Sequence, residues 1–231
     1  MKAVIMAGGK GVRLRPFTYV EPKPLLTVGS INPIEYSIKY LKKCGIDEIF
    51  ISINYLKEKF EICHQYSKKH GIKITLIEEP KQMGTVGSIS LMKNYLNDPF
   101  LLLNGDPFTQ PPYKIMLDKF KKSNADILIG MKEEITNSPY GVMDFDKNNR
   151  VSKIIEKPAR SEWINAGVYL INQKIINLID KEYMDTPDLI KKVIASNGIV
   201  ISFDIGPKWL DIGCLDDYEN ANSVLNEWKY K

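Results

Sequence analysis

The chain has 231 residues, of which 44% are hydrophobic and 26% are charged, and its formal net charge is +4. This length and composition predict one globular domain spanning residues 1–231. Because the net charge is small and the lysines are spread along the chain, we expect no nucleic-acid partner and no membrane partner. No apolar run approaches the length of a membrane span or of a signal-peptide core, so we expect a cytoplasmic protein.

Short apolar strands alternate with helices in the first half of the chain. Strands are expected at residues 3–7, 49–53, 72–77 and 100–103. A helix should begin at Asn32-Pro33-Ile34-Glu35, where Asn is a good N-cap and Pro suits the first turn, and end at Gly45. Further helices are expected at residues 57–69 and 91–96. This alternation predicts an α/β fold with a mostly parallel sheet and helices on both of its faces.

The second half of the chain adds a different element. Residues 141–145 and 151–155 flank the turn-forming stretch 146–149 and predict a small β-hairpin, which we expect at one edge of the domain, facing the substrate. The other expected elements are strands at 127–131, 166–171 and 199–203, and helices at 113–122, 186–198 and 215–228.

A glycine-rich loop follows the first strand. Gly8, Gly9 and Gly11 allow a tight turn that brings bare backbone N–H groups up to a ligand, and Arg13 and Lys23 add cations beside it. The loop lacks the spacing of a dinucleotide fingerprint and of a P-loop. Backbone donors with nearby cations still predict a phosphate-binding cradle.

The stretch from Gly8 to Pro24 resembles the signature G-G-x-G-[TS]-R-L-x-P-L-T-x-x-x-P-K-P of the sugar-1-phosphate nucleotidyltransferases, from which it departs at Val12 and Phe17. Further motifs of that family recur in order along nearly the whole chain. They are Asn104-Gly105-Asp106, Tyr140-Gly141-Val142, Glu156-Lys157-Pro158, Asn165-Ala166-Gly167 and Trp209-Leu210-Asp211-Ile212-Gly213.

The resemblance implies a Rossmann-like (glycosyltransferase-A-like) fold and an enzyme that joins a nucleotide to a sugar 1-phosphate and releases pyrophosphate. It implies a Mg²⁺ ion held by Asp106 and Asp211. The catalytic cations it implies are Arg13, Lys23 and Lys157. The nucleotide-binding residues it implies are Ala7, Gly8, Gly9, Gly11, Glu79, Gly84, Thr85 and Asp106. The substrate-binding residues it implies are Gly141, Glu156, Lys157 and Asn165.

The loop from Glu79 to Gly87 looks most like that of guanylyltransferases acting on mannose-type and heptose-type 1-phosphates. We therefore expect GTP as the nucleotide, followed by CTP, with the Glu79 carboxylate accepting from the N1–H and N2–H₂ groups of guanine. The acceptor stays open, as does assembly into a homo-oligomer. The alternatives are a cytidylyltransferase acting on a sugar or non-sugar phosphate, and a non-catalytic regulator that binds nucleotide sugars. A glycosyltransferase is disfavoured because Asp106-Pro107-Phe108 supplies no D-x-D motif.

Overall fold

The computed structural model describes residues 1–180 and 182–229. A seven-stranded sheet has the order β10-β6-β9-β4-β1-β2-β3, in which β9 is antiparallel to both of its neighbours and the other adjacent pairs are parallel. These strands are β1 (Lys2–Met6), β2 (Glu48–Ile53), β3 (Lys73–Glu78), β4 (Phe100–Asn104), β6 (Ile127–Asn137), β9 (Ala159–Ile171) and β10 (Val200–Asp204). The α/β class and the mostly parallel mixed sheet expected from the sequence are confirmed.

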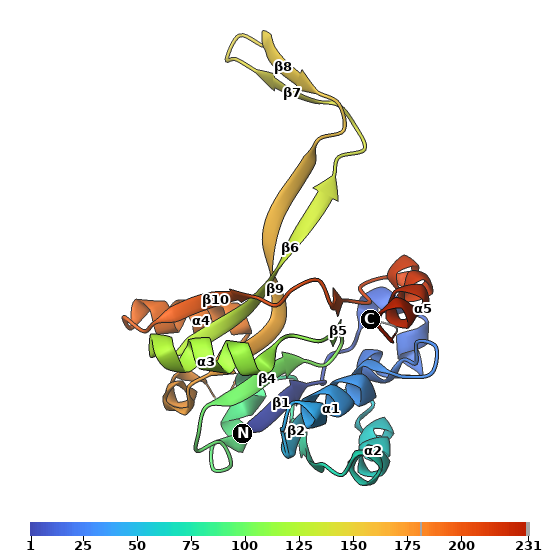
Figure 1. Cartoon of the computed structure of the whole chain (residues 1–231), viewed down its shortest axis with the longest axis vertical. Coiled ribbons are helices and arrows are strands. Elements are labelled where there is room, and N and C mark those ends of the chain that lie inside the picture. Colours follow the sequence, from blue (N-terminus) through green and yellow to red (C-terminus); the bar gives the residue numbers. More distant parts are fainter. Residues whose placement is uncertain (181, 230–231) are drawn as a thin grey trace.

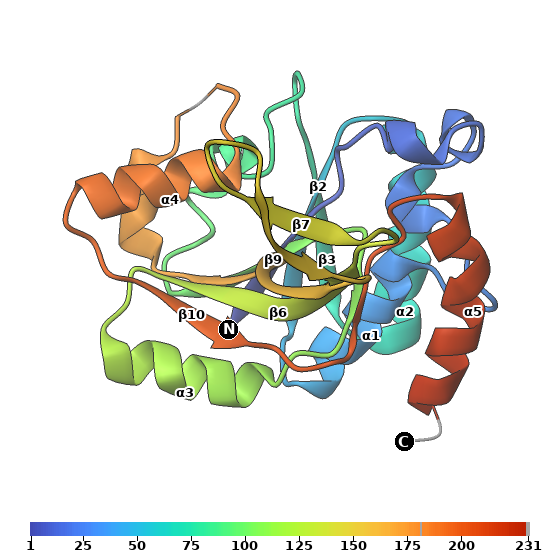
Figure 2. The ribbon, with the colours of Figure 1, turned by 90° about the horizontal axis from the view of Figure 1, so that it is seen from above.

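Helices cover both faces of the sheet (Figure 2). They are α1 (Pro33–Lys43), α2 (Ile62–His70), α3 (Tyr113–Ser123) and α4 (Thr186–Ala195). The last helix, α5 (Leu215–Lys229), packs instead in a third cluster with Leu14 and Leu26. Ile5 of β1 packs in the core cluster under α1, α2 and α3, whereas its neighbour Val4 packs in the cluster under α4. Strands buried on both faces explain the unbroken apolar runs of the sequence. None of the described helices is both long and apolar enough to cross a membrane.

Two local features show how the sequence sets the helices. The Asn32 side chain accepts a hydrogen bond from the backbone N–H of Glu35 at 2.8 Å, which confirms the predicted start of α1. The helix expected at residues 91–96 is wrong, because the chain forms a 3₁₀ helix over Gly87–Met92 instead. Ser90 donates its hydroxyl to the Gly87 carbonyl at 2.7 Å, and such side-chain bonds to the backbone compete with an α-helix.

Strands β6 and β9 extend well beyond the body of the protein (Figure 1). After a register shift between Gly130 and Met131 they pair with each other in continuous register, from Met131↔Asn165 to Asn137↔Ala159. Strands β7 (Val142–Phe145) and β8 (Val151–Ile155) form the predicted hairpin at the far end. We call residues 131–165 the arm.

The arm arises from two interior strands of the sheet, so the expectation of a hairpin inserted at one edge is wrong. The strands predicted at residues 127–131 and 166–171 are also shorter than β6 and β9, because the sequence does not reveal the parts of these strands that lie outside the body. Outside the body both faces of β6 and β9 meet solvent, and the polar stretch from Lys132 to Asn137 carries no buried-strand pattern.

Candidate active site

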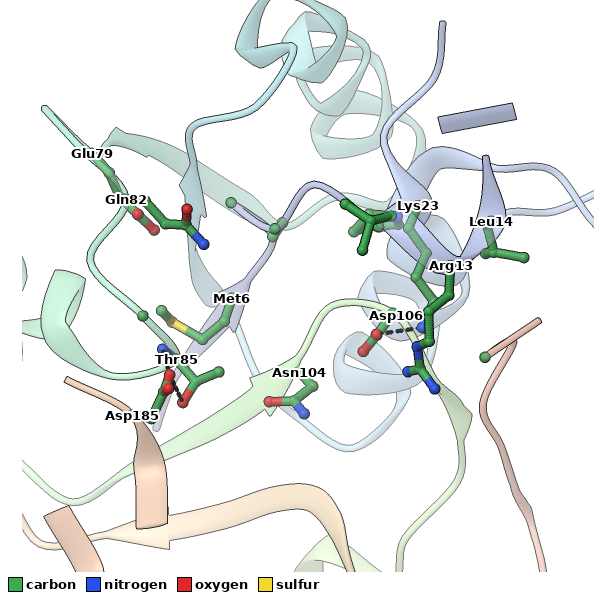
Figure 3. Close-up of a pocket in the computed structure, with 18 of the residues that line it drawn as sticks. Met6, Arg13, Leu14, Lys23, Glu79, Gln82, Thr85, Asn104, Asp106 and Asp185 are labelled. Carbon is green, nitrogen blue, oxygen red and sulfur yellow. Dashed lines mark hydrogen bonds and ion pairs between the residues drawn. The ribbon is translucent and has the colours of Figure 1, made fainter. Parts of the chain in front are cut away.

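A pocket of about 350 Å³ opens at the carboxyl edge of the sheet, beyond the ends of β1, β3 and β4 (Figure 3). Ligands of open α/β sheets bind at this edge. All the residues predicted to bind nucleotide line the pocket, and so do two of the predicted catalytic cations. These are Ala7, Gly8, Gly9, Gly11, Arg13, Lys23, Glu79, Gly84, Thr85 and Asp106.

Lys23 lies between the two carboxylates predicted to bind metal. Its Nζ donates to Asp106 Oδ2 at 2.6 Å and to Asp211 Oδ1 at 2.8 Å (Figure 3 shows the contact with Asp106). The two acidic residues meet because β5 (Phe108–Thr109) pairs antiparallel with β11 (Trp209–Leu210). Leu210 stands opposite Phe108, so the residues just outside this short ladder, Asp106 and Asp211, come close together.

The Lys23 side chain is largely buried, with 10% of its surface exposed. Burial alone lowers the pKa of a lysine, but here the two adjacent carboxylates outweigh it and raise the pKa above its usual value. Lys23 therefore carries a positive charge at neutral pH, and that charge lies inside the pocket. The Arg13 guanidinium is more exposed and lies on the same side, near Gly213.

The glycine loop presents bare backbone to the pocket. Gly11 has a left-handed φ of +59°, and a Cβ built there would lie 2.9 Å from Thr18 Cγ2. Thr18 also donates its hydroxyl to the Gly11 carbonyl at 2.9 Å, which holds the turn. At Gly9, by contrast, a Cβ would meet none of the described atoms within 4 Å. The space next to Gly9 is therefore open for a ligand.

Glu79 is buried at the end of β3 and holds the loop that follows it. Its Oε1 accepts from the Ser52 hydroxyl at 2.8 Å, and its Oε2 accepts from the backbone N–H of Met83 at 3.1 Å. Burial raises the pKa of this carboxyl, although both hydrogen bonds act in the opposite direction. Since both oxygens already have partners in the chain, guanine recognition by Glu79 stays a prediction.

Sequence reasoning missed Tyr183 and Asp185, which line the pocket, and gave no role to Gln82 or to Asn104 of the Asn104-Gly105-Asp106 motif, which also line it. Asp185 Oδ1 accepts from the backbone N–H of Thr85 at 2.9 Å, and its Oδ2 accepts from the Tyr183 hydroxyl at 2.7 Å. Gln82 belongs to the loop from Glu79 to Gly87, so its place in the pocket could have been predicted from the sequence. The place of Asp185 could not, because its contact with Thr85 joins residues 100 positions apart.

The predicted substrate-binding residues lie on the arm. Gly141, Glu156 and Lys157 form the junction between the β6–β9 ribbon and the terminal hairpin, where β8 ends before Pro158 as predicted. None of these three is among the described residues that line the pocket. Asn165 lies at the base of the arm, where its Oδ1 accepts from the backbone N–H of Gly167 at 3.0 Å.

Comparisons with known proteins support one family. Residues 2–227 match the family model described as Nucleotidyl transferase. Mannose-1-phosphate guanyltransferase of Yarrowia lipolytica is 31% identical over 225 residues, which cover 94% of this chain and 62% of that protein. Mannose-1-phosphate guanylyltransferase 1 of Arabidopsis thaliana is 34% identical over 227 residues, covering 94% and 63%. The chain thus spans less than two thirds of the length of these relatives.

Solved structures agree with this result. HddC from Yersinia pseudotuberculosis superposes with a TM-score of 0.73 at 25% identity, covering 97% of this chain and 99% of that one. A putative glucose-1-phosphate thymidylyltransferase from Bacillus anthracis, at 24% identity and a TM-score of 0.75, shares the fold and covers 97% and 94%.

We expect a side chain added at Gly9 to affect ligand binding alone, and one added at Gly11 to affect stability as well. Gly9→Val should weaken triphosphate binding by tenfold or more while leaving the melting temperature unchanged, because the new side chain enters open pocket space. Gly11→Val should also lower the melting temperature, since its left-handed φ strains any L side chain and Thr18 blocks the Cβ. Calorimetric titration and thermal unfolding measure the two effects. Unchanged triphosphate affinity in folded Gly9→Val would contradict a phosphate cradle at this loop.

Proposed function

The chain belongs to the nucleotidyl transferase family, and we propose that it transfers GMP from GTP to a sugar 1-phosphate, forming a nucleotide sugar and releasing pyrophosphate. The observation that carries this proposal is the convergence of a bare glycine loop, two cations and the Asp106 carboxylate in one pocket at the carboxyl edge of the sheet, with the Asp211 carboxylate bound to the pocket residue Lys23. The nucleotide choice is supported by the names of the relatives and by a structure of HddC complexed with GMP-PN.

In the proposed reaction an oxygen of the sugar 1-phosphate attacks the α-phosphorus of GTP, and the bond to pyrophosphate breaks. The attacking oxygen is already anionic, so the protein needs no general base. It must instead align two polyanions and offset the charge that develops at phosphorus. The N–H groups around Gly9 hold the phosphates, and the Arg13 guanidinium and the Lys23 ammonium lie where they can neutralise them.

Asp106 and Asp211 fit the divalent cation expected in this family. Asp106 Oδ2 and Asp211 Oδ1 both face the position that the Lys23 ammonium now takes, and carboxylate oxygens are ligands that Mg²⁺ prefers. No cluster of three or more His, Cys, Asp or Glu side chains suited to a metal occurs in the described residues. The other ligands would therefore be phosphate oxygens and water. Bound Mg²⁺ would supply additional charge neutralisation at the phosphates.

A pyrophosphate-release screen tests the proposed function. GTP, CTP, ATP, UTP and dTTP are each paired with mannose, glucose and heptose 1-phosphates, and we expect the fastest release with GTP. If the Glu79 carboxylate accepts hydrogen bonds from guanine N1–H and N2–H₂, Glu79→Gln should reduce the ratio of the rate with GTP to the rates with the other triphosphates. Preference for CTP or dTTP would overturn the guanine assignment. Tight nucleotide binding without release from any pair would favour a non-catalytic regulator.

The two pocket cations should act mainly on the rate. Removing a charge that stabilises the transition state costs on the order of 3 kcal/mol, or about a hundredfold in kcat. We expect Arg13→Met and Lys23→Met each to show at least this loss with a smaller change in KM. Lys121→Met is the matched control, because Lys121 is exposed on α3 and does not line the pocket. A loss of only a fewfold would remove Arg13 or Lys23 from the catalytic group.

Magnesium binding should depend on whether Lys23 leaves the two carboxylates. We expect Mg²⁺ to bind weakly alone and far more tightly with GTP, whose phosphates can attract the Lys23 ammonium. Lys23→Met should bind Mg²⁺ without nucleotide about tenfold more tightly than the wild type, a gain of about 1.4 kcal/mol. Calorimetry with Asp106→Asn and Asp211→Asn as controls tests this. Additive losses in the double Asp variant would contradict a shared ion.

A further inference from the structure

The arm exposes an unusual amount of apolar surface. Its large side chains with more than 40% of their surface exposed are Ile135, Tyr140, Met143, Phe145, Val151, Ile154, Ile155 and Trp163. A two-stranded ribbon without a core is only marginally stable in water, and contiguous exposed apolar patches mark interaction sites. Figure 1 shows that the far end of the arm stands clear of its own body. The arm therefore needs a surface to pack on.

The arm does not deliver its charged junction to its own pocket. The seven residues from Met131 to Asn137 extend by about 3.3 Å each, which places Lys157 roughly 20 Å from the body. A lysine side chain bridges only about 6 Å of that distance. Yet Lys157 is held at a φ of +44°, a strained conformation that persists at functional sites, and it follows Glu156, whose carboxylate lies against Gly141.

The surface next to the pocket also exposes apolar side chains. The loop after β1 exposes Val12, Phe17, Tyr19 and Val20, each with at least 44% of its surface accessible. Val12 itself lines the pocket. An apolar arm seated on this loop would lie at the mouth of the pocket.

We propose that the arm of one chain docks on the residue 12–20 loop of a second copy and completes that copy's pocket with Glu156 and Lys157. The contribution to the pocket rests on the proposed function, whereas the docking does not. A two-fold axis makes the exchange reciprocal, so each copy gives one arm and receives one. Lys157 then brings a third cation to the sugar 1-phosphate, and Glu156 brings an acceptor for sugar hydroxyls.

The mass in solution tests the docking without any assay of activity. Sedimentation should give twice the chain mass of 26.4 kDa for the wild type. The double variant Met143→Lys/Ile154→Lys changes a cross-strand pair on the arm and should sediment as a monomer. Ile115→Lys/Ile194→Lys is the matched control, because these residues are equally exposed on α3 and α4, and it should remain a dimer. A monomeric wild type, or a dimeric arm variant, would overturn the proposal.

Complementation tests whether the arm acts in the second copy. Lys157→Met and Arg13→Met, carrying different tags, are co-expressed and their heterodimers isolated by tandem purification. Each variant alone should lose about a hundredfold in kcat. The heterodimer should recover about half of the wild-type rate, because one of its two sites combines an intact pocket with an intact arm. No recovery would mean that each arm serves its own chain and would overturn the completion of the site in trans.

Discussion

The Lys23 ammonium joins three distant parts of the chain, since it contacts Asp106 and Asp211 from a loop near the start of the sequence. The three charged side chains of this group stabilise one another. A lysine buried without an anion is costly, and two carboxylates that face each other without a cation repel. The pair β5–β11 brings the acids together, and the lysine then ties the glycine loop to both. This one cation therefore fixes how the glycine loop and the two carboxylates lie relative to one another.

Most of the sheet could be predicted because its strands are buried on both faces and read as unbroken apolar runs, as at β1 and β4. The helix α1 could be predicted from a local signal, the Asn32 cap. The arm could not, because its strands outside the body lose the contrast between buried and exposed faces. Strands β5 and β11 have two residues each, so their pairing is a tertiary contact with no local pattern.

In the site, too, the residues with a local sequence pattern could be predicted and those placed by tertiary contacts could not. Gly8, Glu79 and Asp106 could be predicted because each follows a strand, and strand ends meet at one edge. The partners that hold them in place were not predictable: Ser52 beneath Glu79, and Asp185 against Thr85. Such contacts arise only when segments far apart in the sequence pack together. Glu156 and Lys157 match the family motif, yet within one chain they lie apart from the pocket. Their part in the proposed reaction therefore depends on the surface that the arm contacts.

The distribution of the site along the chain also bears on its biosynthesis. Lys23 and Asp211 are 188 residues apart. At 5–20 residues per second, a ribosome needs about 10–40 s to add the second carboxylate after the lysine has been made. Strands β1, β2 and β3 can pair early, because they follow one another in sequence and lie side by side. Three of the seven strands of the sheet can therefore pair in the nascent protein well before Asp211 is available to the Lys23 ammonium, so the contact that joins the glycine loop to this carboxylate forms late.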